Sequence, residues 1–426
     1  MTKHAYNMET EAPKLYNYAR PENRHKPMTL THYTYRFRLR PNKDQKHRLA
    51  RHFGVCRFVY NYFLDRRNRL YRENKQGSSY HKDCAELTKL KKELDWIGEA
   101  NSQSLQQELK NLDTAFNRFF KKQAKFPKFH SKKTDKQSFR IPQFVSVKDG
   151  LLHFPKFREG IKVKLHRDIE GEIKYATVSM NRAGQFFVSV CVEKHIEPLP
   201  KVKKEVGVDL GVKDLATCSD GQVFENIKPY RTLEKRLKHL HRELSRKVKG
   251  SKSRERARRR LSKLYQRIAD IRSNHLHKVS HGITSDNQAI YLEDLNVNGM
   301  MKNRRLSKSI QDVSLYELVR QIEYKALWRG RTVVKIGRFY PSSKACSTCG
   351  FINQSLTLSD RSWVCPRCRI EHDRDFNAAT NILMEGKRTV GTTGLAGGEK
   401  RQPSARKQFS VKPEAATSLR AKASRG

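Results

Sequence analysis

The sequence predicts a multidomain α/β protein with an additional β-rich region, and three observations support this fold class. The chain has 426 residues, which is more than one compact core usually holds. Its hydrophobic pattern changes from helical spacing to strand alternation after residue 129, and beyond residue 204 strands alternate with helices. Two closely spaced cysteine pairs near the C-terminus predict a small metal-binding module.

The composition indicates a polyanionic partner. Lys and Arg number 89 against 43 Asp and Glu, so the formal net charge is +46. Such a charge destabilises a compact protein by self-repulsion unless a polyanion neutralises it. Nucleic acid is the expected polyanion, because each neutralised phosphate releases counterions. An anionic membrane fits poorly, since no apolar run approaches the roughly 20 residues that span a bilayer.

The expected compartment is a reducing one, as the cytoplasm is. No apolar segment of a secretory signal is visible near the N-terminus. Of the eight cysteines, four are scattered singly within predicted helices or strands, and we expect these to be core thiols in a reducing environment. They are Cys56, Cys84, Cys191 and Cys218.

The first half of the chain predicts a β region interrupted by helices. Residues 1–30 lack periodicity and predict a disordered leader. Residues 31–40 contain a strand, because apolar and basic residues alternate from Tyr33 to Leu39. Helical spacing follows over residues 41–136, and residues 137–200 include a hairpin with a glycine turn. The simplest arrangement returns the first strand to the later ones, so that the helical segment is an insertion.

The second half predicts a separate α/β unit over residues 201–386. Buried strands are expected at 206–211 and 289–293, each with an acidic residue at or near its end. Two long basic helices between them carry leucine and isoleucine at coiled-coil-like spacing. A helix over 314–328 and a strand over 332–336 complete the pattern. Residues 387–426 predict a disordered basic tail, because Gly, Thr, Ser, Lys and Arg dominate them.

Two Cys-x-x-Cys pairs predict a structural zinc site. Fifteen residues separate the pairs, within the spacing typical of four-cysteine zinc sites. The expected ligands are Cys346, Cys349, Cys365 and Cys368. Four thiolates fill a tetrahedral shell, so this zinc would not be catalytic. Gly350 allows the tight turn after the first pair, and His372 is expected at the surface rather than as a spare ligand.

Three acidic residues form the candidate catalytic set: Asp209, Glu293 and Asp375. Each lies at a predicted strand end or helix start, where side chains from different elements can converge. Carboxylates are the ligands that Mg²⁺ prefers, and a metal pair can activate water for phosphodiester hydrolysis. Alone, each has an ordinary alternative. Asp209 could end a strand in a turn, Glu293 could form a solvated acidic pair with Asp294, and Asp375 could cap a helix.

The order of these motifs resembles a known family. Gly-Val-Asp209-Leu-Gly, Leu-Glu293-Asp-Leu-Asn and Asp375-Phe-Asn-Ala-Ala-Thr-Asn are similar to the three catalytic motifs of RuvC-type nuclease domains. The cysteine pairs between the second and third motifs match the arrangement in TnpB nucleases of insertion sequences, which are relatives of type V CRISPR effectors. Three further segments also resemble this family: Gly54-Val-Cys-Arg-Phe-Val-Tyr60-Asn61, Phe126-Pro-Lys-Phe129 and Phe339-Tyr-Pro-Ser-Ser343.

The resemblance implies a fold in several parts. Residues 31–40 and 137–200 would form a wedge-type, oligonucleotide-binding β-barrel, and residues 41–136 a helical recognition insert. Residues 201–386 would form an RNase H-like (RuvC) nuclease domain, with the zinc ribbon at 341–371.

The resemblance also implies an RNA-guided DNA endonuclease that depends on Mg²⁺ or Mn²⁺. Its partners would be a transposon-derived guide RNA, with one protein per guide, and double-stranded target DNA. Asp209, Glu293 and Asp375 would be the ligands of the catalytic metal, and Asp373 is a nearby competitor for the third position. A nuclease-inactive RNA-guided repressor and a DNA transposase are the alternatives.

In this family a short DNA motif beside the target is recognised by the helical insert and the adjoining barrel. The residues at the corresponding positions are Tyr80, Ser102, Gln103 and Gln106. Their polar and aromatic side chains suit contacts with base edges.

Overall fold

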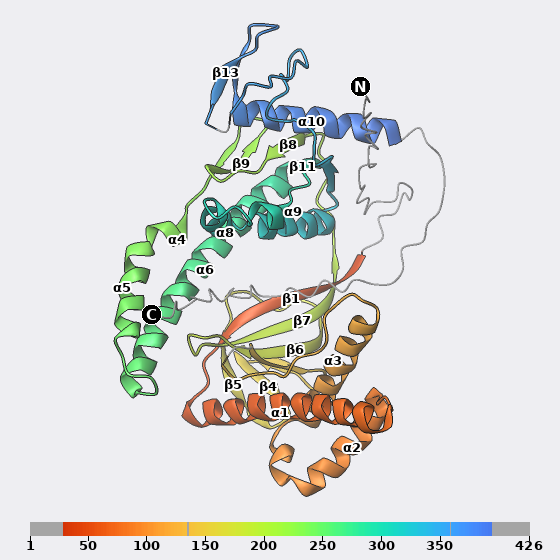
Figure 1. Ribbon diagram of the computed structural model, residues 1–426. Helices are drawn as coiled ribbons and strands as arrows, with labels where there is room; N and C mark the ends of the chain where they lie inside the picture. The colour runs from red at the N-terminus through yellow and green to blue at the C-terminus, as the bar shows by residue number, and fades with distance from the viewer. Residues whose placement is uncertain (1–28, 134–135, 358, 394–426) are drawn as a thin grey trace, which may run out of the picture. The chain divides into compact units, whose positions relative to one another are not determined.

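A computed structural model describes residues 29–133, 136–357 and 359–393. The predicted leader lies almost entirely outside these residues, as does most of the predicted tail. The described chain divides into two compact units. The N-terminal unit comprises His32–Ser179 and Phe186–Lys194, and the C-terminal unit comprises Met180–Gln185 and the residues from His195 onward (Figure 1). Every helix in the described part of the chain is too short or too polar to cross a lipid bilayer.

A seven-stranded sheet forms the centre of the N-terminal unit, in the order β2-β6-β7-β1-β5-β4-β3. Its strands are β1 (Thr29–Leu39), β2 (Gln137–Ile141), β3 (Ser146–Lys148), β4 (Leu151–Phe154), β5 (Phe157–Lys164), β6 (Glu172–Met180) and β7 (Phe186–Ile196). The first strand therefore lies between two strands that follow the helical segment. In the described residues this order is open, with β2 and β3 at its ends, and closure into a barrel stays a prediction.

Alternation along β1 gives the strand its two faces. Tyr35, Phe37 and Leu39 are buried, whereas Arg36 and Arg38 lie on the opposite face. Their guanidinium groups lie over the ring of Phe187, at 4.3 and 5.1 Å from its centroid. The cationic face predicted from the alternating pattern is thus present in the structure.

Three helices follow β1: α1 (Lys43–Asn74), α2 (Tyr80–Glu93) and α3 (Ser102–Phe120). A capping box starts α1, because Asn42 and Gln45 each accept the other's backbone N–H. Apolar residues of α1 at helical spacing are buried, as the sequence predicts. Of the four single cysteines, Cys56, Cys191 and Cys218 are buried, and Cys84 is half-buried.

The C-terminal unit is built on a five-stranded sheet in the order β10-β9-β8-β11-β12. The strands are β8 (Glu205–Asp209), β9 (Asp214–Cys218), β10 (Val223–Glu225), β11 (Ala289–Glu293) and β12 (Thr332–Ile336). β8, β11 and β12 are parallel, while β9 and β10 run antiparallel to their neighbours. The carboxyl ends of the three parallel strands consequently meet at one edge of the sheet.

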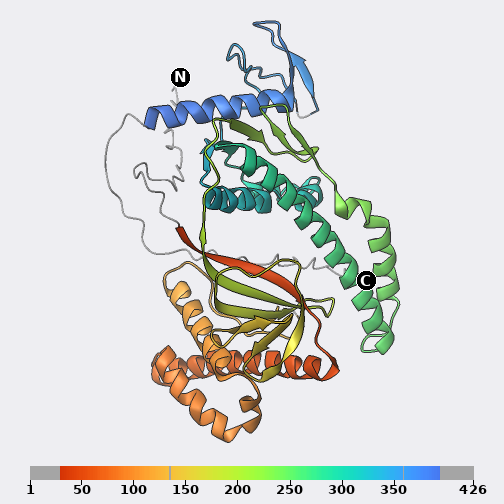
Figure 2. The same ribbon diagram turned by 180° about the vertical axis from the view of Figure 1, so that it is seen from behind.

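Helices cover both faces of this sheet (Figures 1 and 2). α6 (Lys252–Asp286) and α9 (Leu315–Arg329) pack on one face through a large apolar cluster. α10 (Arg374–Thr393) packs on the other. The contact with α10 is very close, since a Cβ atom on Gly207 of β8 would collide with the carbonyl oxygen of Ala379. A side chain at either glycine of this interface, Gly207 or Gly386, would force the helix away from the sheet.

α10 corrects the predicted start of the tail. The sequence predicted disorder from residue 387, but the helix continues to Thr393. The extension is held by packing that composition alone does not reveal. Gly386 lies against the ring of Tyr291, and Thr389 is buried.

A basic helical hairpin joins β10 to β11. It consists of α5 (Glu234–Ser245) and the first half of α6, and the short helix α4 (Pro229–Thr232) precedes it. The predicted coiled-coil-like stripe forms its seam, with Leu237, Leu261, Leu264 and Ile268 buried together. The apolar spacing of the sequence also places Ile271 in this stripe, but Ile271 is exposed, so the buried seam ends at Ile268. The short helices α7 (Val297–Met300) and α8 (Ser307–Val313) precede α9.

Candidate active site and metal centre

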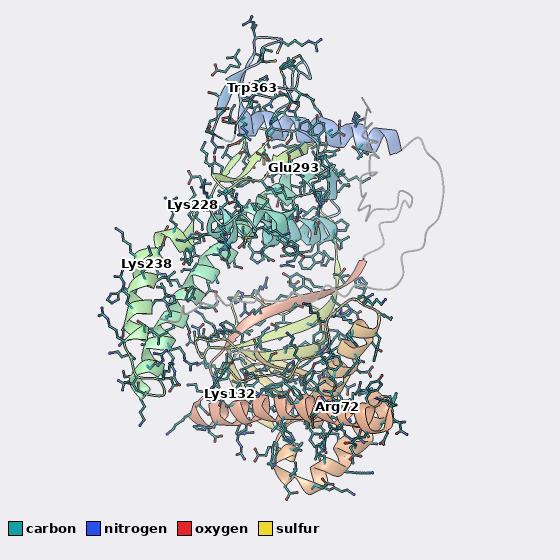
Figure 3. The ribbon with its side chains drawn as sticks, in the orientation of Figure 1. Arg72, Lys132, Lys228, Lys238, Glu293 and Trp363 are labelled. Carbon is teal, nitrogen blue, oxygen red and sulfur yellow. The ribbon has the colours of Figure 1, made fainter. Side chains whose placement is uncertain are left out.

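Two of the three predicted acids end adjacent parallel strands. Asp209 is the last residue of β8, and Glu293 is the last residue of β11 (Figure 3). Leu292 is paired with Val208. The residues that follow them, Glu293 and Asp209, therefore lie at the same edge of the sheet. Asp375 lies in the first turn of α10. The fold therefore brings to one region three residues that are spread over more than a hundred positions of the chain.

The electrostatics of Asp209 show that these carboxylates influence one another. Burial, helped by the negative charges of Glu293 and Asp375, raises the pKa of Asp209 to about 7. Arg374 opposes this shift. Burial also raises the pKa of Glu293, against a hydrogen bond from Ser342. Acids held in this way bind protons, or a cation in their place, more readily than exposed acids do.

Ser342 is a part of this site that the sequence analysis missed. Its side chain is 3% exposed, and its hydroxyl donates a hydrogen bond to Glu293 Oε1. The segment Phe339–Ser343 was noted only for its family resemblance, and its proximity to β11 depends on the tertiary fold. The acid and the serine are 49 positions apart in the chain.

Two buried asparagines of α10 fix the segment that carries Ser342. Asn381 Nδ2 donates to the carbonyl oxygens of Ser342 and Ala345, at 2.8 and 2.7 Å. Asn377 Nδ2 donates to the same Ala345 oxygen at 2.7 Å, and its Oδ1 accepts the backbone N–H of Ser347 at 2.9 Å. The helix that carries Asp375 is thus tied to the segment that holds Glu293. We call Ser342, Asn377 and Asn381 the asparagine–serine clamp.

The start of α10 distinguishes the two neighbouring aspartates. Asp373 Oδ1 accepts the backbone N–H of Phe376 at 2.9 Å, which is the bond that a helix cap makes. Asp375 makes no such cap, and its carboxylate lies 3.6 Å from Arg361 Nη1. Capping therefore belongs to Asp373, which leaves the Asp375 side chain available to the acidic site.

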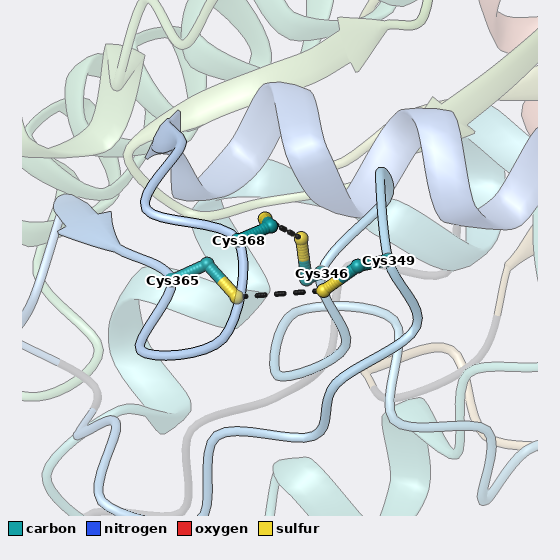
Figure 4. Close-up of side chains that lie close together, drawn as sticks. All are labelled: Cys346, Cys349, Cys365 and Cys368. Carbon is teal, nitrogen blue, oxygen red and sulfur yellow. Dashed lines mark hydrogen bonds between the residues drawn. The ribbon is translucent and has the colours of Figure 1, made fainter.

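The four predicted cysteines converge at the base of the ribbon (Figure 4). Their sulfur atoms all lie within 4.8 Å of one another, and Cys346–Cys368 and Cys349–Cys365 are each 3.6 Å apart. Disulfides need about 2.05 Å. Thiolates about 2.3 Å from one tetrahedral ion lie a little under 4 Å apart, so the donor set fits a zinc-sized ion. In the described part of the chain, no other group of His, Cys, Asp or Glu is this tight, and the three acids are more widely spaced.

Backbone turns prepare the ribbon for thiolates. Gly350 follows the first pair with a φ of 75°, which is the left-handed turn predicted for it. Arg369 takes the equivalent position after the second pair, with a φ of 61°. Burial raises the pKa of the Cys365 thiol, but N–H groups of Cys368 and Arg367 outweigh this effect and lower it to about 7.

His372 does not lie at the surface, contrary to the sequence-based expectation. It is buried, with its Nε2 atom 3.0 Å from Cys346 Sγ. The reason is a small hairpin of β13 (Ser362–Val364) and β14 (Glu371–Asp373), in which His372 pairs with Trp363. The two rings lie 5.0 Å apart. Burial lowers the pKa of His372.

The predicted motif-reading residues lie at helix starts in the N-terminal unit. Tyr80 begins α2, and the other three lie in the first two turns of α3. Ser102 and Gln106 are exposed, and Ser102 Oγ accepts a hydrogen bond from Lys91 at 2.6 Å. Gln103 Nε2 donates to Gln143 Oε1 at 2.9 Å. No local pattern predicts this glutamine pair, which joins α3 to the loop between β2 and β3.

Comparison with protein families gives three matches along the chain. Residues 189–304 match a family described as "Probable transposase", and residues 316–382 match "Cas12f1-like, TNB domain". Residues 28–76 match a "Helix-turn-helix domain". The last description does not fit the structure, because the described residues of this range form one strand followed by one continuous helix.

Two similar proteins align with this chain over most of their own length. One, from Streptomyces pristinaespiralis, is named "Putative RNA-guided DNA endonuclease"; it is 40% identical over 83% of this chain and 89% of its own. Another, InsQ of Escherichia coli (strain K12), is 34% identical over 83% and 92%. Among solved structures, the Cas12f1–sgRNA–target DNA complex matches with a TM-score of 0.51 over 83% of this chain and 98% of the matched chain. The identity is 13%, so this match supports a shared fold.

Proposed function

The chain belongs to the TnpB family of RNA-guided DNA endonucleases, and on that premise we propose that it cuts DNA at sites selected by a bound guide RNA. One observation carries the proposal: Asp209, Glu293 and Asp375 meet at the carboxyl edge of the parallel strands. A decayed nuclease would not need to keep an acid whose pKa is raised by burial and by the charges of two further acids.

The three carboxylates would hold Mg²⁺ or Mn²⁺, which supplies an activated water and stabilises the leaving oxygen. Asp209 and Glu293 are fixed by their strands, and Ser342 orients the Glu293 carboxylate. Arg361 and Arg374 lie near the acids and would attract a DNA phosphate to them. The asparagine–serine clamp would hold α10, and with it Asp375, in a fixed position relative to Asp209 and Glu293.

A zinc ion on the four cysteines would be structural. All four positions of a tetrahedral shell are filled by sulfur, so none remains for substrate or water. The ribbon leads directly into α10, so the ion would fix the start of the helix that carries Asp375.

Binding to guide RNA and DNA is supported by the charge of the α5–α6 hairpin. Residues 234–263 contain fourteen Lys and Arg but three Glu, and Lys238 projects from α5 (Figure 3). Base pairing between guide and target would provide sequence selectivity, while the protein recognises backbone and shape.

The sheet of the N-terminal unit would form the oligonucleotide-binding β-barrel. Tyr80, Ser102, Gln103 and Gln106 would read the DNA motif beside the target.

The proposal is tested on protein purified with its nucleic acid. We expect RNA to copurify, and the complex to cut DNA that matches the RNA in Mg²⁺ but not in EDTA. Copurified DNA without RNA, together with activity on transposon ends, would establish a transposase instead. RNA-guided binding to DNA without cleavage in Mg²⁺ or in Mn²⁺ would establish a repressor.

The raised pKa of Asp209 predicts how cleavage depends on pH and metal. The ions bind the deprotonated carboxylate, so protons compete with them below pH 7. We expect the Mg²⁺ concentration for half-maximal cleavage to rise about fivefold from pH 7 to pH 6, and to change little above pH 8. Titrating Mg²⁺ at each pH with preformed complex measures this. Equal midpoints at pH 6 and pH 8 would contradict the predicted competition.

Removing the Ser342 hydroxyl is expected to slow cleavage about tenfold, equivalent to about 1.4 kcal/mol, because the bond to a charged carboxylate is lost. Single-turnover rates of Ser342→Ala measure this effect, with guide and target binding unchanged. Ser343→Ala is the matched control, since Ser343 is the next residue and is also not fully exposed. Similar losses in both variants would mean that the segment, rather than the hydroxyl, is responsible.

A further inference from the structure

Five phenylalanines and four lysines fall within residues 116–129, at the end of α3 and in the chain that follows it. The phenylalanines are Phe116, Phe119, Phe120, Phe126 and Phe129, and the lysines are Lys121, Lys122, Lys125 and Lys128. We call this set the aromatic–lysine patch. It includes the Phe126–Phe129 segment, which the proposed nuclease mechanism does not use.

Part of the patch serves the fold. The ring of Phe126 contacts Phe116 and Phe119 edge-on, with centroids 5.6 and 5.2 Å apart. Such contacts hold the chain that leaves α3 against the helix. Phe116 and Phe119 also continue the helical stripe of Leu109 and Leu112, which are fully buried. These three rings therefore have a structural role.

Phe120 has no comparable role. Its ring is 71% exposed, although it lies 5.4 Å from Phe119 and 6.1 Å from Phe116. It is the last residue of α3 and lies beyond the fully buried part of the helix's apolar stripe. Phe129 is 55% exposed and Phe126 is 45% exposed. The patch thus presents ring faces to solvent where the core does not require them.

The lysines make the patch strongly cationic. All four are exposed, and none forms an ion pair with any of the described carboxylates. Exposed rings bordered by unneutralised cations match single-stranded nucleic acid, because bases stack on the rings while phosphates bind the cations. An apolar protein partner would not need four surrounding positive charges.

We infer that the aromatic–lysine patch binds the DNA strand displaced when the guide RNA pairs with its target, with Phe120 stacking on an unpaired base. The inference rests on the proposed function, which supplies that strand. Its sequence changes with every target, so a protein contact must tolerate any base. Phenylalanine stacking and lysine–phosphate contacts have this property.

The position of the patch on α3 fits this role. Phe120 is seventeen residues after Gln103, which is about 26 Å along a helix. One rigid helix would contact the motif at its start and the separated strand at its end. The patch is therefore a contact distinct from motif reading.

The test compares a fully paired target with one whose non-target strand is already unpaired beside the motif. With the complete protein–guide complex, we expect Phe120→Ala to cut the paired target about tenfold more slowly than the unaltered chain. The pre-opened target should be cut at an equal rate by both. Phe120→Trp should restore the rate on the paired target. Tyr316→Ala is the matched control, because Tyr316 is also 71% exposed but lies on α9. Equal slowing on both targets, or unchanged cleavage of both, would overturn the inference.

A second measurement does not need cleavage, so it separates this inference from the proposed function. Stacked bases quench tryptophan, so an oligodeoxythymidine should quench the added fluorescence of Phe120→Trp relative to the unaltered chain. Oligodeoxythymidine should quench it more strongly than an oligouridine of equal length. Quenching by the oligouridine alone would mean that the patch binds the guide RNA. The absence of quenching by either oligonucleotide would rule out base stacking on residue 120. Absence of cutting by the unaltered complex would count only against the proposed nuclease.

Discussion

Replacing Asp209 with Ala is expected to lower the DNA cleavage rate about a thousandfold or more, equivalent to about 4 kcal/mol of barrier. The charges of Glu293 and Asp375 act on this carboxylate, and its loss would remove one of the three metal ligands that we propose. Binding of guide and target should persist, because the charged surfaces of the protein are intact. Cleavage of labelled target by purified complexes measures the first effect, and gel shift in EDTA measures the second.

The control is Asp220→Asn, which removes a charge at the β9–β10 turn, where Asp220 pairs with Lys204 at 2.7 Å. Cleavage at the normal rate by Asp209→Ala would contradict the site assignment.

Thermal unfolding provides an independent test of the site assignment. The pKa of Asp209 in the folded protein is raised, so its stabilising contribution is present below pH 4 and is lost as the pH rises through about 7. Asp209→Asn should therefore melt at a higher temperature than the unaltered metal-free protein at pH 8.

The second large effect is expected from Cys365→Ser. One ligand of four is lost, and bound zinc should fall from one ion per chain to nearly none, because the free energy of zinc binding maintains such modules. Without the ion, residues 341–371 should become sensitive to protease and cleavage should nearly cease, since Asp375 follows the ribbon directly. Metal analysis, limited proteolysis and single-turnover cleavage measure the three effects.

Cys84→Ser is the control, because this half-buried thiol lies on α2, away from the other cysteines. It should keep its zinc and its activity. A Cys365→Ser protein that retained one zinc and full activity would show that the ribbon does not depend on the four-thiolate site.

Local patterns were sufficient to predict the elements that hold the acids. Strand alternation and apolar runs identified β1, β8 and β11, because side-chain periodicity depends on nearest neighbours in the chain. Asp209 and Glu293 were found because each ends a predicted strand, and Asp375 because it lies at a predicted helix start. The cysteine spacing predicted a cluster whose sulfur atoms are indeed close together.

Contacts between distant segments could not be predicted in the same way. Ser342 reaches Glu293 across 49 positions, and Asn381 reaches Ser342 across 39. Nothing in the local sequence specifies these bonds. The burial of His372 likewise depends on a cross-strand pairing with Trp363, and the last turns of α10 depend on the ring of Tyr291.

The late position of α10 has a consequence for protein synthesis. Asp209 and Glu293 leave the ribosome long before Asp375, and until α10 is made, one face of the sheet is uncovered. A nascent chain shorter than about 380 residues therefore has two of the three acids and no helix against Gly207. The proposed metal site is therefore complete only after α10 has been made, so a chain still in synthesis at the ribbon would lack one of the three carboxylates that we propose hold the metal.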